Sequence, residues 1–520
     1  MLAAMPLPPT TTPSGDETPV RGRDDACPGA LRLHPADDGS LARIRVPGGL
    51  LTARQAQALG RVAEELGDGR LEITSRGNAQ VRGLAAGCGA ELAARLRATG
   101  LLPSDRHDRV RNIVASPLSG LDGAGHADVV AWVRELDAAL CDEACLDTLP
   151  GRGELSGLSG RFLFALDDGR GDVAALGADV TLIATPGGGA VLRAGGPPAG
   201  AGVASVAAGG AAGGGDLWVR SEDAARAAAL TAVEFLARAR ESGTRAWRIR
   251  ELPAQHAVTA DRLATRLADA GIDTEPHPGA PVPRPPRPAP APGLISGPDG
   301  RHALSVALPL GRVSAAQWRL LAGLASRSRA AELRMTPWRG VLLPGFNPDD
   351  ARGALSELSG AGLVTTPDSP WLGVGACTGR PGCAKSLADV RAHATRMVAG
   401  TARGVADPAE ADAAETATAE ALTDTGRVVA GGSEPRRMGG TASGGGRQGA
   451  PDPLPVYVSG CERRCGHPGG RWVDALATGD TDYRVTVRGG ARGDTPEAED
   501  GVEVTAEQLA DAVAAVRGTT

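Results

Sequence analysis

The sequence predicts an α+β protein built around two copies of a ferredoxin-like half domain. The first observation is an internal repeat: when the chain is shifted by 262 residues, Val46 falls on Leu308 and Leu71 falls on Leu333 without a gap. The second is a β-α-β-β-α order of apolar segments in each copy, which is the order of a ferredoxin-like half. The third is a set of low-complexity stretches that divides the chain.

Each copy contains the same expected elements in the same order. Good N-cap residues, Thr52 and Ser314, open the first helix of each copy. The other expected elements are strands at 42–46, 71–74 and 79–84 with a helix at 90–99, and strands at 303–308, 333–336 and 340–343 with a helix at 350–359. Because one shift holds over about 75 residues, gene duplication explains it better than chance, and the halves are expected to pair into one pseudo-symmetric body.

Four stretches are expected to lack regular structure. They are a Pro/Thr-rich tail at 1–25, a Gly/Ala-rich loop at 195–215, a Pro-rich linker at 276–293, and an insertion at 400–452 that is rich in Ala, Gly, Thr and acidic residues. The insertion has few large apolar side chains, so burial cannot offset the entropy lost on ordering it.

Charge and composition exclude several classes of function. The net charge of −6 and the pI near 5.9 argue against a nucleic-acid or anionic-membrane surface. No apolar stretch of about 18 residues would span a membrane. The N-terminus lacks the features of a secretory signal, so a cytoplasmic location is expected. Because neither a P-loop nor a G-x-G-x-x-G turn after a strand is present, electrons should come from a separate donor rather than a flavin or nicotinamide domain.

The cysteines favour metal or cluster ligation over disulfides. Five residues separate Cys377 from Cys383 and three separate Cys461 from Cys465, with glycines nearby that let the backbone approach a cluster. Four thiolates can hold an iron–sulfur cubane. A structural zinc ion and unrelated buried thiols are the alternatives, although the first spacing is unlike common zinc sites. The pair of Cys141 and Cys145 lacks flanking glycines, and buried thiols are the safer interpretation there.

The motif C-x5-C followed by G-C-x3-C resembles the cluster signature of siroheme-dependent sulfite and nitrite reductases, and the duplicated half domain is similar to theirs. In the repeat alignment Cys377 falls on Ala115, so only the second copy carries thiols. The resemblance implies one [4Fe–4S] cluster held by Cys377, Cys383, Cys461 and Cys465. It also implies a sulfite/nitrite-reductase-like fold with half repeats at 26–100 and 294–365, a tetrapyrrole-binding α/β domain at 101–275, and an α/β cluster domain at 366–520.

The same resemblance assigns residues that grip the acid side chains of a tetrapyrrole. Guanidinium groups bind carboxylates bidentately, which suits a ligand with many carboxylate side chains. The matching residues are Arg76, Asn78 and Gln80 in T-S-R-G-N-A-Q, Arg111 and Asn112 in V-R-N-I-V, Arg161 in S-G-R-F-L-F, and Arg339 beside Trp338 in the second copy. Leu163 stands where the K-x-K pair of the reductases has its second basic residue. An exposed surface position is the alternative for any one of these arginines.

Further motifs resemble those of precorrin-3B synthases: D-A-C-P-G near the N-terminus, R-F-L-F-A-L-D-D-G, and C-G-H-P, in which His467 is a candidate neighbour of the cluster. That family implies O2-dependent hydroxylation of precorrin-3A with γ-lactone formation, in aerobic cobalamin biosynthesis. The implied cofactors are the [4Fe–4S] cluster and a non-haem iron whose ligands cannot be named; the implied donor is a ferredoxin or an NAD(P)H-dependent reductase. A siroheme-dependent sulfite or nitrite reductase is the alternative, and a non-catalytic electron-transfer protein would not need the arginines.

Overall fold

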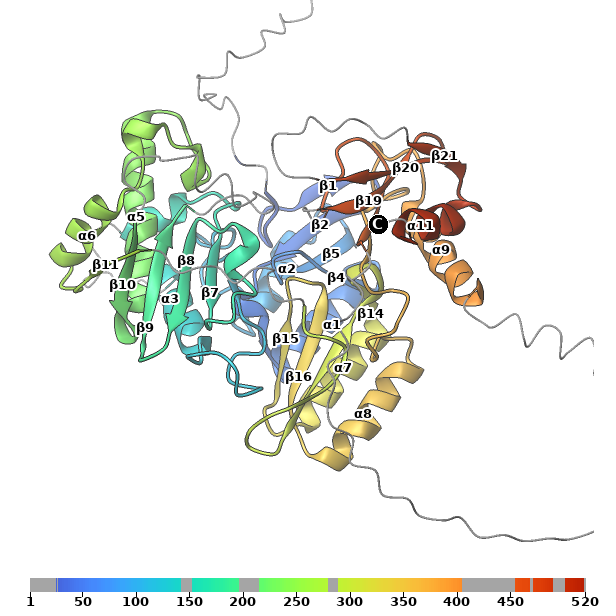
Figure 1. The fold of residues 1–520 in the computed structure, drawn as a ribbon, viewed down its shortest axis with the longest axis horizontal. Helices are drawn as coiled ribbons and strands as arrows, with labels where there is room; N and C mark the ends of the chain where they lie inside the picture. Colours follow the sequence, from blue (N-terminus) through green and yellow to red (C-terminus); the bar gives the residue numbers. More distant parts are fainter. Residues whose placement is uncertain are drawn as a thin grey trace, which may run out of the picture.

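The computed structural model describes residues 25, 27–141, 152–195, 215–278, 289–404, 454–467, 471–489 and 501–518. The expected tail apart from Asp25, most of the loop at 195–215, most of the linker at 276–293, and the insertion beyond residue 404 lie outside the described residues, as does Cys145. No described helix combines the length and apolar character needed to cross a bilayer. Figure 1 shows the described elements arranged in three lobes.

Two five-stranded sheets belong to the repeated halves, and each takes one strand from the other half. The first sheet has the order β1 (His34–Ala36), β2 (Gly39–Ile44), β5 (Ala79–Leu84), β4 (Arg70–Ile73) and β14 (Arg312–Ser314). The second has the order β12 (Gly293–Ser296), β13 (His302–Ala307), β16 (Gly340–Phe346), β15 (Glu332–Met335) and β3 (Leu50–Thr52). The exchanged strands β3 and β14 are repeat equivalents, so the pairing is reciprocal and confirms a pseudo-symmetric body.

Helices of the two halves meet along the pseudo-symmetry axis. The pair is α1 (Ala53–Glu65) and α7 (Ala315–Arg327), each opened by the expected N-cap in a full capping box, Thr52 with Gln55 and Ser314 with Gln317. The fully buried Trp318 donates its indole N–H to the carbonyl of Ala56 at 2.7 Å. These residues occupy the same repeat position, so the dyad passes close to this bond. The second helices of the halves are α2 (Gly89–Arg97) and α8 (Pro348–Gly360).

Two further sheets share one topology. One runs β6 (Ile113–Ala115), β7 (Phe164–Asp167), β8 (Val180–Thr185), β9 (Gly189–Ala194), β10 (Asp216–Arg220) and β11 (Glu275–His277). The other runs β17 (Val374–Ala376), β18 (Val456–Ser459), β19 (Trp472–Ala477), β20 (Asp482–Arg488) and β21 (Val502–Thr505). In both, the first three strands are parallel and the later strands are antiparallel. The duplication therefore extends beyond the half domains.

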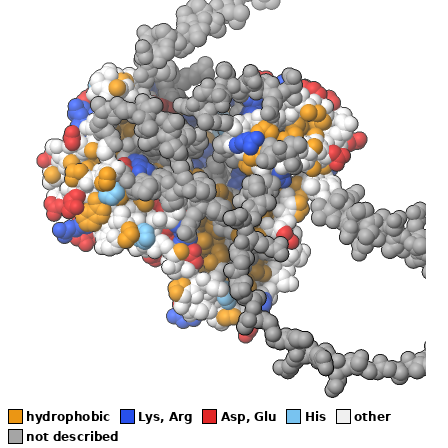
Figure 2. Space-filling model, in the orientation of Figure 1, with side chains coloured by type: hydrophobic (Ala, Val, Ile, Leu, Met, Phe, Trp, Pro, Cys, Tyr) orange, Lys and Arg blue, Asp and Glu red, His pale blue; other side chains and the backbone are white. Residues whose placement is uncertain are grey.

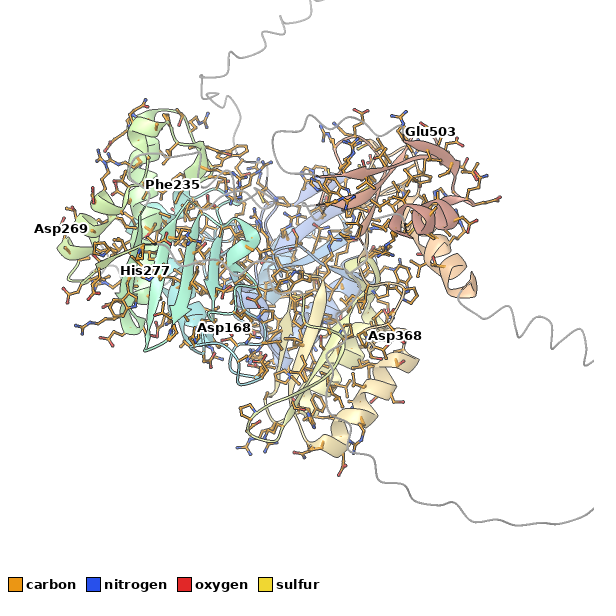
Figure 3. The ribbon with its side chains drawn as sticks, viewed as in Figure 1. Asp168, Phe235, Asp269, His277, Asp368 and Glu503 are labelled. Carbon is orange, nitrogen blue, oxygen red and sulfur yellow. The ribbon has the colours of Figure 1, made fainter. Side chains whose placement is uncertain are left out.

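Helices cover these two sheets at matching places in the chain. The first sheet carries α3 (Val130–Cys141), α5 (Ala224–Ser242) and α6 (Ala260–Asp269), and the second carries α9 (Val390–Gly404) and α11 (Leu509–Gly518). Alanine, leucine and valine dominate all three large apolar cores. On the face in Figure 2, acidic and basic side chains are interspersed around the rims of the lobes. Asp168, labelled in Figure 3, lies in the loop after β7, at the end facing the second half repeat.

The observed bounds differ from the expected ones at several element ends. The last strand of the second half continues to Phe346 rather than ending at 343. The strands expected at 42–46 and 303–308 begin and end earlier, as β2 and β13. Four strands of three or four residues, β1, β3, β12 and β14, were not expected, because pieces this short carry no periodic signal.

Candidate functional site

The four candidate ligand cysteines follow two neighbouring parallel strands. Cys377 follows β17 and Cys461 follows β18, and because these strands are paired in parallel, both loops leave the same edge of the sheet. The backbone N–H of Cys377 donates to Val458 at 3.1 Å, and that of Gly460 donates to the Cys377 sulfur at 3.2 Å. The second contact is the kind of N–H···S bond that tunes an iron–sulfur cluster.

Residues of the first half repeat hold the loop from Cys377 to Cys383. Arg82, on β5, donates to the carbonyl of Gly382 at 2.8 Å and forms a bidentate pair with Asp38. A Cβ at Gly382 would lie 2.6 Å from a carboxylate oxygen of Asp38, so a larger residue there would displace Asp38. Arg391, on α9, donates to the carbonyl of Cys377 at 3.2 Å. Both ends of this loop are therefore anchored by arginines.

Aromatic side chains contact the second cysteine loop, which contains Cys461 and Cys465. Tyr457 donates its hydroxyl hydrogen to the carbonyl of Cys465 at 2.6 Å, and burial raises the pKa of this phenol to about 12, so it stays protonated. Arg339 donates to Gly466 at 3.2 Å and lies over the Tyr457 ring. His467 stacks on Trp472 with ring centroids 4.6 Å apart. The expected neighbour His467 thus lies beside the cluster loop.

The chemistry of this donor set fits a cubane cluster. Burial raises the pKa of the Cys377 thiol, and the Cys461 and Cys465 sulfurs raise it further; burial and Cys461 do the same for Cys465. Bound iron would offset this mutual repulsion of thiolates. Within the described part of the chain, no three His, Cys, Asp or Glu side chains are close enough to hold a single metal ion. The non-haem iron implied by the resemblance therefore has no ligand set there.

A second polar cluster surrounds Cys27 and contains three arginines. Arg45 is 2% exposed, and its Nη2 lies 3.3 Å from the Cys27 sulfur, while Nη1 on the same guanidinium has no hydrogen-bond partner. Arg43 approaches the same sulfur at 3.9 Å. Arg76 donates to the carbonyls of Gly160 and Arg161 at 3.2 and 3.1 Å. Among the described residues, no carboxylate forms an ion pair with these three arginines.

The electrostatics of this cluster favour an anion. Burial, together with the positive charges of Arg248 and Arg45, lowers the pKa of Arg76 to about 10. An anionic ligand would relieve that repulsion. Arg161, which is exposed, lies over the indole of Trp247 at 4.9 Å. Arg76, which contacts the backbone of Arg161, thus lies in one cluster with Arg43 and Arg45, which the sequence reasoning missed. The pattern A-R-I-R-V was the available signal, because it places two arginines on one face of a buried strand.

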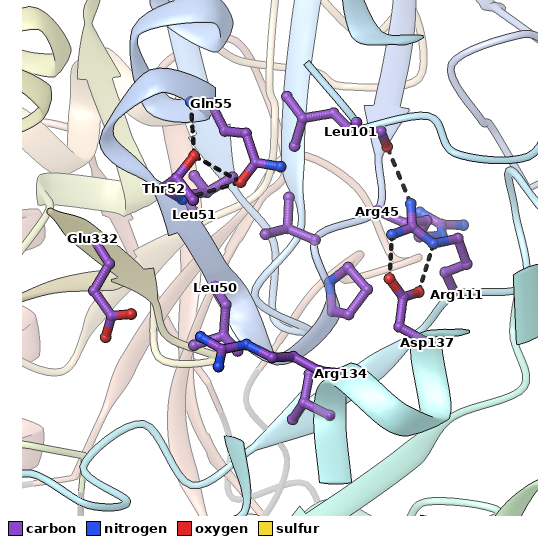
Figure 4. A pocket seen from close by; sticks show the side chains of 14 residues that line it. Arg45, Leu50, Leu51, Thr52, Gln55, Leu101, Arg111, Arg134, Asp137 and Glu332 are labelled. Atoms are coloured by element: carbon purple, nitrogen blue, oxygen red, sulfur yellow. Dashed lines mark hydrogen bonds and ion pairs between the residues drawn. The ribbon is translucent and has the colours of Figure 1, made fainter. Parts of the chain in front are cut away.

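The other expected tetrapyrrole contacts are engaged with the protein itself. Arg111 forms a bidentate pair with Asp137, with both contacts at 2.7 Å, and also donates to Leu101 (Figure 4). Asn78 and Asn112 are buried and bonded to each other at 3.1 Å. Gln80 bridges Arg43 and Glu72. The structure therefore brings the guanidinium of Arg76 against the backbone of Arg161, while the guanidinium of Arg111 pairs with Asp137.

Figure 4 also shows the pocket that Arg111 lines, of about 220 Å³. Its walls include Thr52, Arg134 and Glu332, and none of the four candidate ligand cysteines reaches it. The volume falls below the range of roughly 300–1,000 Å³ typical of pockets for small organic ligands. A larger hollow of about 850 Å³ is lined by Arg97, Arg134 and Cys141, again away from those cysteines.

Leu163 belongs to a small buried apolar group in the first α/β domain. Leu163 is 5% exposed and packs with Val114, Ala165, Val173 and Ala178. Trp338, from the second half repeat, packs against this group, while its neighbour Arg339 contacts the Cys465 loop. Trp338 and Arg339 thus join the first α/β domain to the cluster loops. The surroundings of Leu163 are therefore apolar, and Trp338 packs against the same apolar group.

Comparison with known proteins agrees with this architecture. The family model described as "Nitrite/Sulfite reductase ferredoxin-like half domain" matches residues 34–99 and 295–361. A solved structure, described as that of the Mycobacterium tuberculosis NirA protein, has a TM-score of 0.58 and 19% sequence identity, and the likeness covers 91% of this chain and 79% of that chain. At this identity the likeness shows the fold, which is α+β and similar to NirA.

Two curated relatives match different lengths of the chain. A ferredoxin–nitrite reductase of Synechococcus elongatus is 38% identical over 134 residues, so the match covers 25% of this chain and only 25% of that protein. A precorrin-3B synthase of a Sinorhizobium species is 26% identical over 380 residues, covering 72% of this chain and 73% of that protein. The higher identity is confined to a short segment, and the longer match is distant.

Proposed function

The chain is a member of the sulfite/nitrite reductase superfamily, and from that premise we propose that it acts as a precorrin-3B synthase. In this reaction the precorrin-3A macrocycle is hydroxylated with O2 and a γ-lactone closes from its ring A acetate. Reducing equivalents come from a ferredoxin or an NAD(P)H-dependent reductase. The second oxygen atom leaves as water after taking up two electrons and two protons.

The observation that carries the proposal is the burial of Leu163 in an apolar group against which Trp338 packs. A reductase acting on sulfite or nitrite needs positive charge and protons beside the bound anion, and the K-x-K pair of such enzymes supplies them. Here Leu163 is buried at the second position of that pair, in an apolar group against which Trp338 packs. An ionised lysine could not be buried there without a large desolvation cost. O2 is small and apolar, so an apolar side chain at this position suits O2 better than an oxyanion.

The arginine cluster supports a tetrapyrrole with several acid groups as the ligand. Arg45 is buried and Arg76 is half-buried, and neither pairs with a carboxylate of the described chain. A carboxylated ligand would therefore gain charge-assisted hydrogen bonds on entering. Arg161, whose backbone carbonyl accepts from Arg76, adds an exposed guanidinium over Trp247. The four cysteines would hold the [4Fe–4S] cluster, which supplies electrons one at a time when bound. The chain's own residues bind and orient the macrocycle and exclude water around it.

Binding and chemistry can be tested separately. Arg76→Ala should weaken anaerobic precorrin-3A binding by roughly 30- to several-thousand-fold, because removing one partner of a buried charge pair costs about 2–5 kcal/mol. The cluster spectrum should not change, and Arg76→Lys should restore only part of the affinity, since an ammonium cannot form the fork. Exposed Arg352, paired with Asp349, offers a matched Arg→Ala control. Equal affinity in Arg76→Ala and wild type would contradict the assignment.

The product decides between this function and its alternative. Admission of O2 with a reductant should convert bound precorrin-3A into an oxygenated, lactonised product, detected by mass. A siroheme-dependent sulfite or nitrite reductase is the second candidate, favoured by the 38% identity of the half-domain segment to a nitrite reductase. Turnover of sulfite or nitrite by siroheme-loaded protein, without binding of precorrin-3A, would establish that alternative.

A further inference from the structure

A row of polar side chains crosses the first sheet from the arginine cluster to the cysteine loop. Arg43, Gln80, Glu72 and Arg312 stand directly opposite one another on β2, β5, β4 and β14. Arg43 donates to Gln80 at 3.0 Å, and Gln80 donates to Glu72 at 2.8 Å. Cross-strand neighbours lie on one face of a sheet, so these bonds form a continuous ladder.

The ladder continues into the cluster domain through Arg391. This side chain donates to the second carboxylate oxygen of Glu72 at 2.6 Å, and its Nε donates to the carbonyl of Cys377 at 3.2 Å. Arg312 is the third partner of Glu72, at 3.2 Å. A single buried carboxylate thus joins the first half repeat, the second half repeat and the cluster domain.

Glu72 carries its negative charge in this position. Burial raises the pKa of Glu72, but the charges of Arg391 and Arg312 and the hydrogen bond from Arg391 outweigh that effect and hold the pKa below its usual value. The carboxylate has two oxygens, one bonded to Gln80 and the other to Arg391. A change in charge at either end of the ladder therefore alters the relative strengths of the bonds that Glu72 makes to Gln80 and Arg391.

We propose that Glu72 and Gln80 are positioning residues that couple two sites. One is the arginine cluster, when a carboxylated ligand occupies it; the other is the iron–sulfur cluster at Cys377, through its reduction state. The inference rests on the proposed function, because it takes the arginine cluster as a ligand site and the four cysteines as cluster ligands. A ligand carboxylate that binds Arg43 weakens the hydrogen bond from Arg43 to Gln80. This in turn changes the strength of the ion pair between Glu72 and Arg391. An electron added to the cluster draws Arg391 toward Cys377 and changes the same contacts from the other end.

The sign and symmetry of the coupling follow from charge and linkage. Both the ligand and the added electron are negative, so each disfavours the other. Coupling between sites is reciprocal: the factor by which the ligand lowers the tendency of the cluster to be reduced equals the factor by which reduction weakens ligand binding. Direct repulsion through space would have the same sign. Only coupling through the ladder depends on Glu72 and Gln80.

Glu332→Gln is a matched control for Glu72→Gln. Glu332 lies on β15, the equivalent strand of the second half, and pairs with Arg334 at 2.8 Å, a contact that does not lead to the cysteines. Both substitutions exchange a carboxylate for an amide of the same shape. The full chain, with its cluster reconstituted, is titrated without air against uroporphyrin III, an octacarboxylate porphyrin, before and after reduction with dithionite.

The wild type should bind the porphyrin at least about fivefold more weakly after reduction, within the usual range of coupling between sites. Glu72→Gln and Gln80→Met should bring that ratio within about twofold while leaving the cluster content normal, and Glu332→Gln should keep the wild-type ratio. In the absence of porphyrin, Glu72→Gln should also raise the midpoint potential of the cluster measured by EPR, because Arg391 loses its counter-charge.

The outcomes separate the coupling from the function. Equal affinity for the oxidised and reduced wild type would overturn the coupling alone, as would an unchanged ratio in both ladder variants. No porphyrin binding by the oxidised wild type would overturn the ligand site, and with it the coupling and the binding step of the proposed function. Loss of lactonised product with the affinity ratio intact would overturn the proposed function and support the coupling.

Discussion

Asp172 is a carboxyl group whose charged form the fold disfavours. Burial, and then the negative charge of Asp167, raise its pKa to about 7, although Ser116 donates a hydrogen bond to it at 2.6 Å. The group lies in the loop after β7, in the first α/β domain. An acid with a raised pKa holds its proton in the folded state at pH values where the unfolded chain has lost it.

The effect of pH on stability follows from that proton. The folded state binds more protons than the unfolded state between about pH 4 and pH 7, so stability should fall as the pH rises through this window. Asp172→Asn should therefore raise the free energy of unfolding at pH 8, by no more than about 4 kcal/mol, and have little effect near pH 4. Urea unfolding at the two pH values measures this. The control is Asp349→Asn at an exposed site; an equal gain at both pH values would contradict the argument.

The four cysteines of the candidate cluster give the second prediction at this scale. Changing any one of Cys377, Cys383, Cys461 or Cys465 to serine should remove the brown chromophore and lower the bound iron and sulfide, because a cubane needs a thiolate at each corner. Cys88→Ser and Cys141→Ser should change neither, since these thiols lie outside the two cysteine loops. Full iron and sulfide content in Cys461→Ser would remove that residue from the ligand set.

At the residue scale, the sequence indicates which residues are candidate ligands better than it indicates which residues contact each other. The spacing of the cysteines and the glycines beside them is local information, and the structure places these four residues on two adjoining loops. The pairing of Arg111 with Asp137 was not predictable, because nothing in V-R-N-I-V indicates which acid faces it across the packed α3. Gln80 was assigned to a ligand for the same reason. Its partner Glu72 is fixed by strand register, which the sequence does not reveal.

Among the elements, the helices with capping boxes were predicted closely and the exchanged strands were not. A capping box uses residues three apart, so Thr52 and Ser314 mark their helix starts in the sequence itself. The exchanged strands β3 and β14 pair with strands of the opposite half. A strand of three residues is too short to show a periodic pattern, so the sequence does not identify the strand it pairs with.

The contact of α1 with α7 gives a prediction at the element scale. The side chain of Trp318 packs close to the pseudo-symmetry axis. It leaves no space on α1, because a Cβ at Gly60 would lie only 2.9 Å from its ring. Trp318→Ala should cost about 3–5 kcal/mol of unfolding free energy through the cavity it leaves, and Trp318→Phe roughly 1–3 kcal/mol, because the carbonyl of Ala56 loses its donor. Urea unfolding gives these values. Trp218→Phe, which removes a longer bond to Thr185 in another sheet, serves as the control and should cost less.

At the scale of the whole molecule, the duplication covers more than the matched half domains. The family model stops at residues 99 and 361, yet the shift that aligns the halves also carries β6 close to β17 and α3 close to α9. The two α/β sheets share their order of parallel and antiparallel strands. The sequence hides this because the loops between these strands have diverged in length, and the second sheet alone carries the cysteine loops. The expected pseudo-symmetry was confirmed, while its extent came from the structure.

Reciprocal strand exchange predicts how the molecule responds to a cut between its copies. A protease site placed within residues 279–288 would separate β1 to β11 from β12 to β21. The two pieces should elute together under native conditions, because each completes a sheet of the other and α1 packs on α7. Either piece expressed alone should aggregate, since it would expose an unpaired strand edge and the apolar face of a helix.

The exchange itself can be separated from the helix contact by one substitution. Val313, on β14, stands opposite Leu71 in the first sheet, and proline there would remove a backbone donor from the ladder. Val313→Pro should leave the uncut chain folded, because the linker keeps the copies at high effective concentration, but it should make the cut pieces separate at a lower urea concentration. Size-exclusion chromatography across a urea series measures this. Pieces that separate in buffer without urea, in the absence of any substitution, would show that the exchanged strands contribute little to holding the copies together.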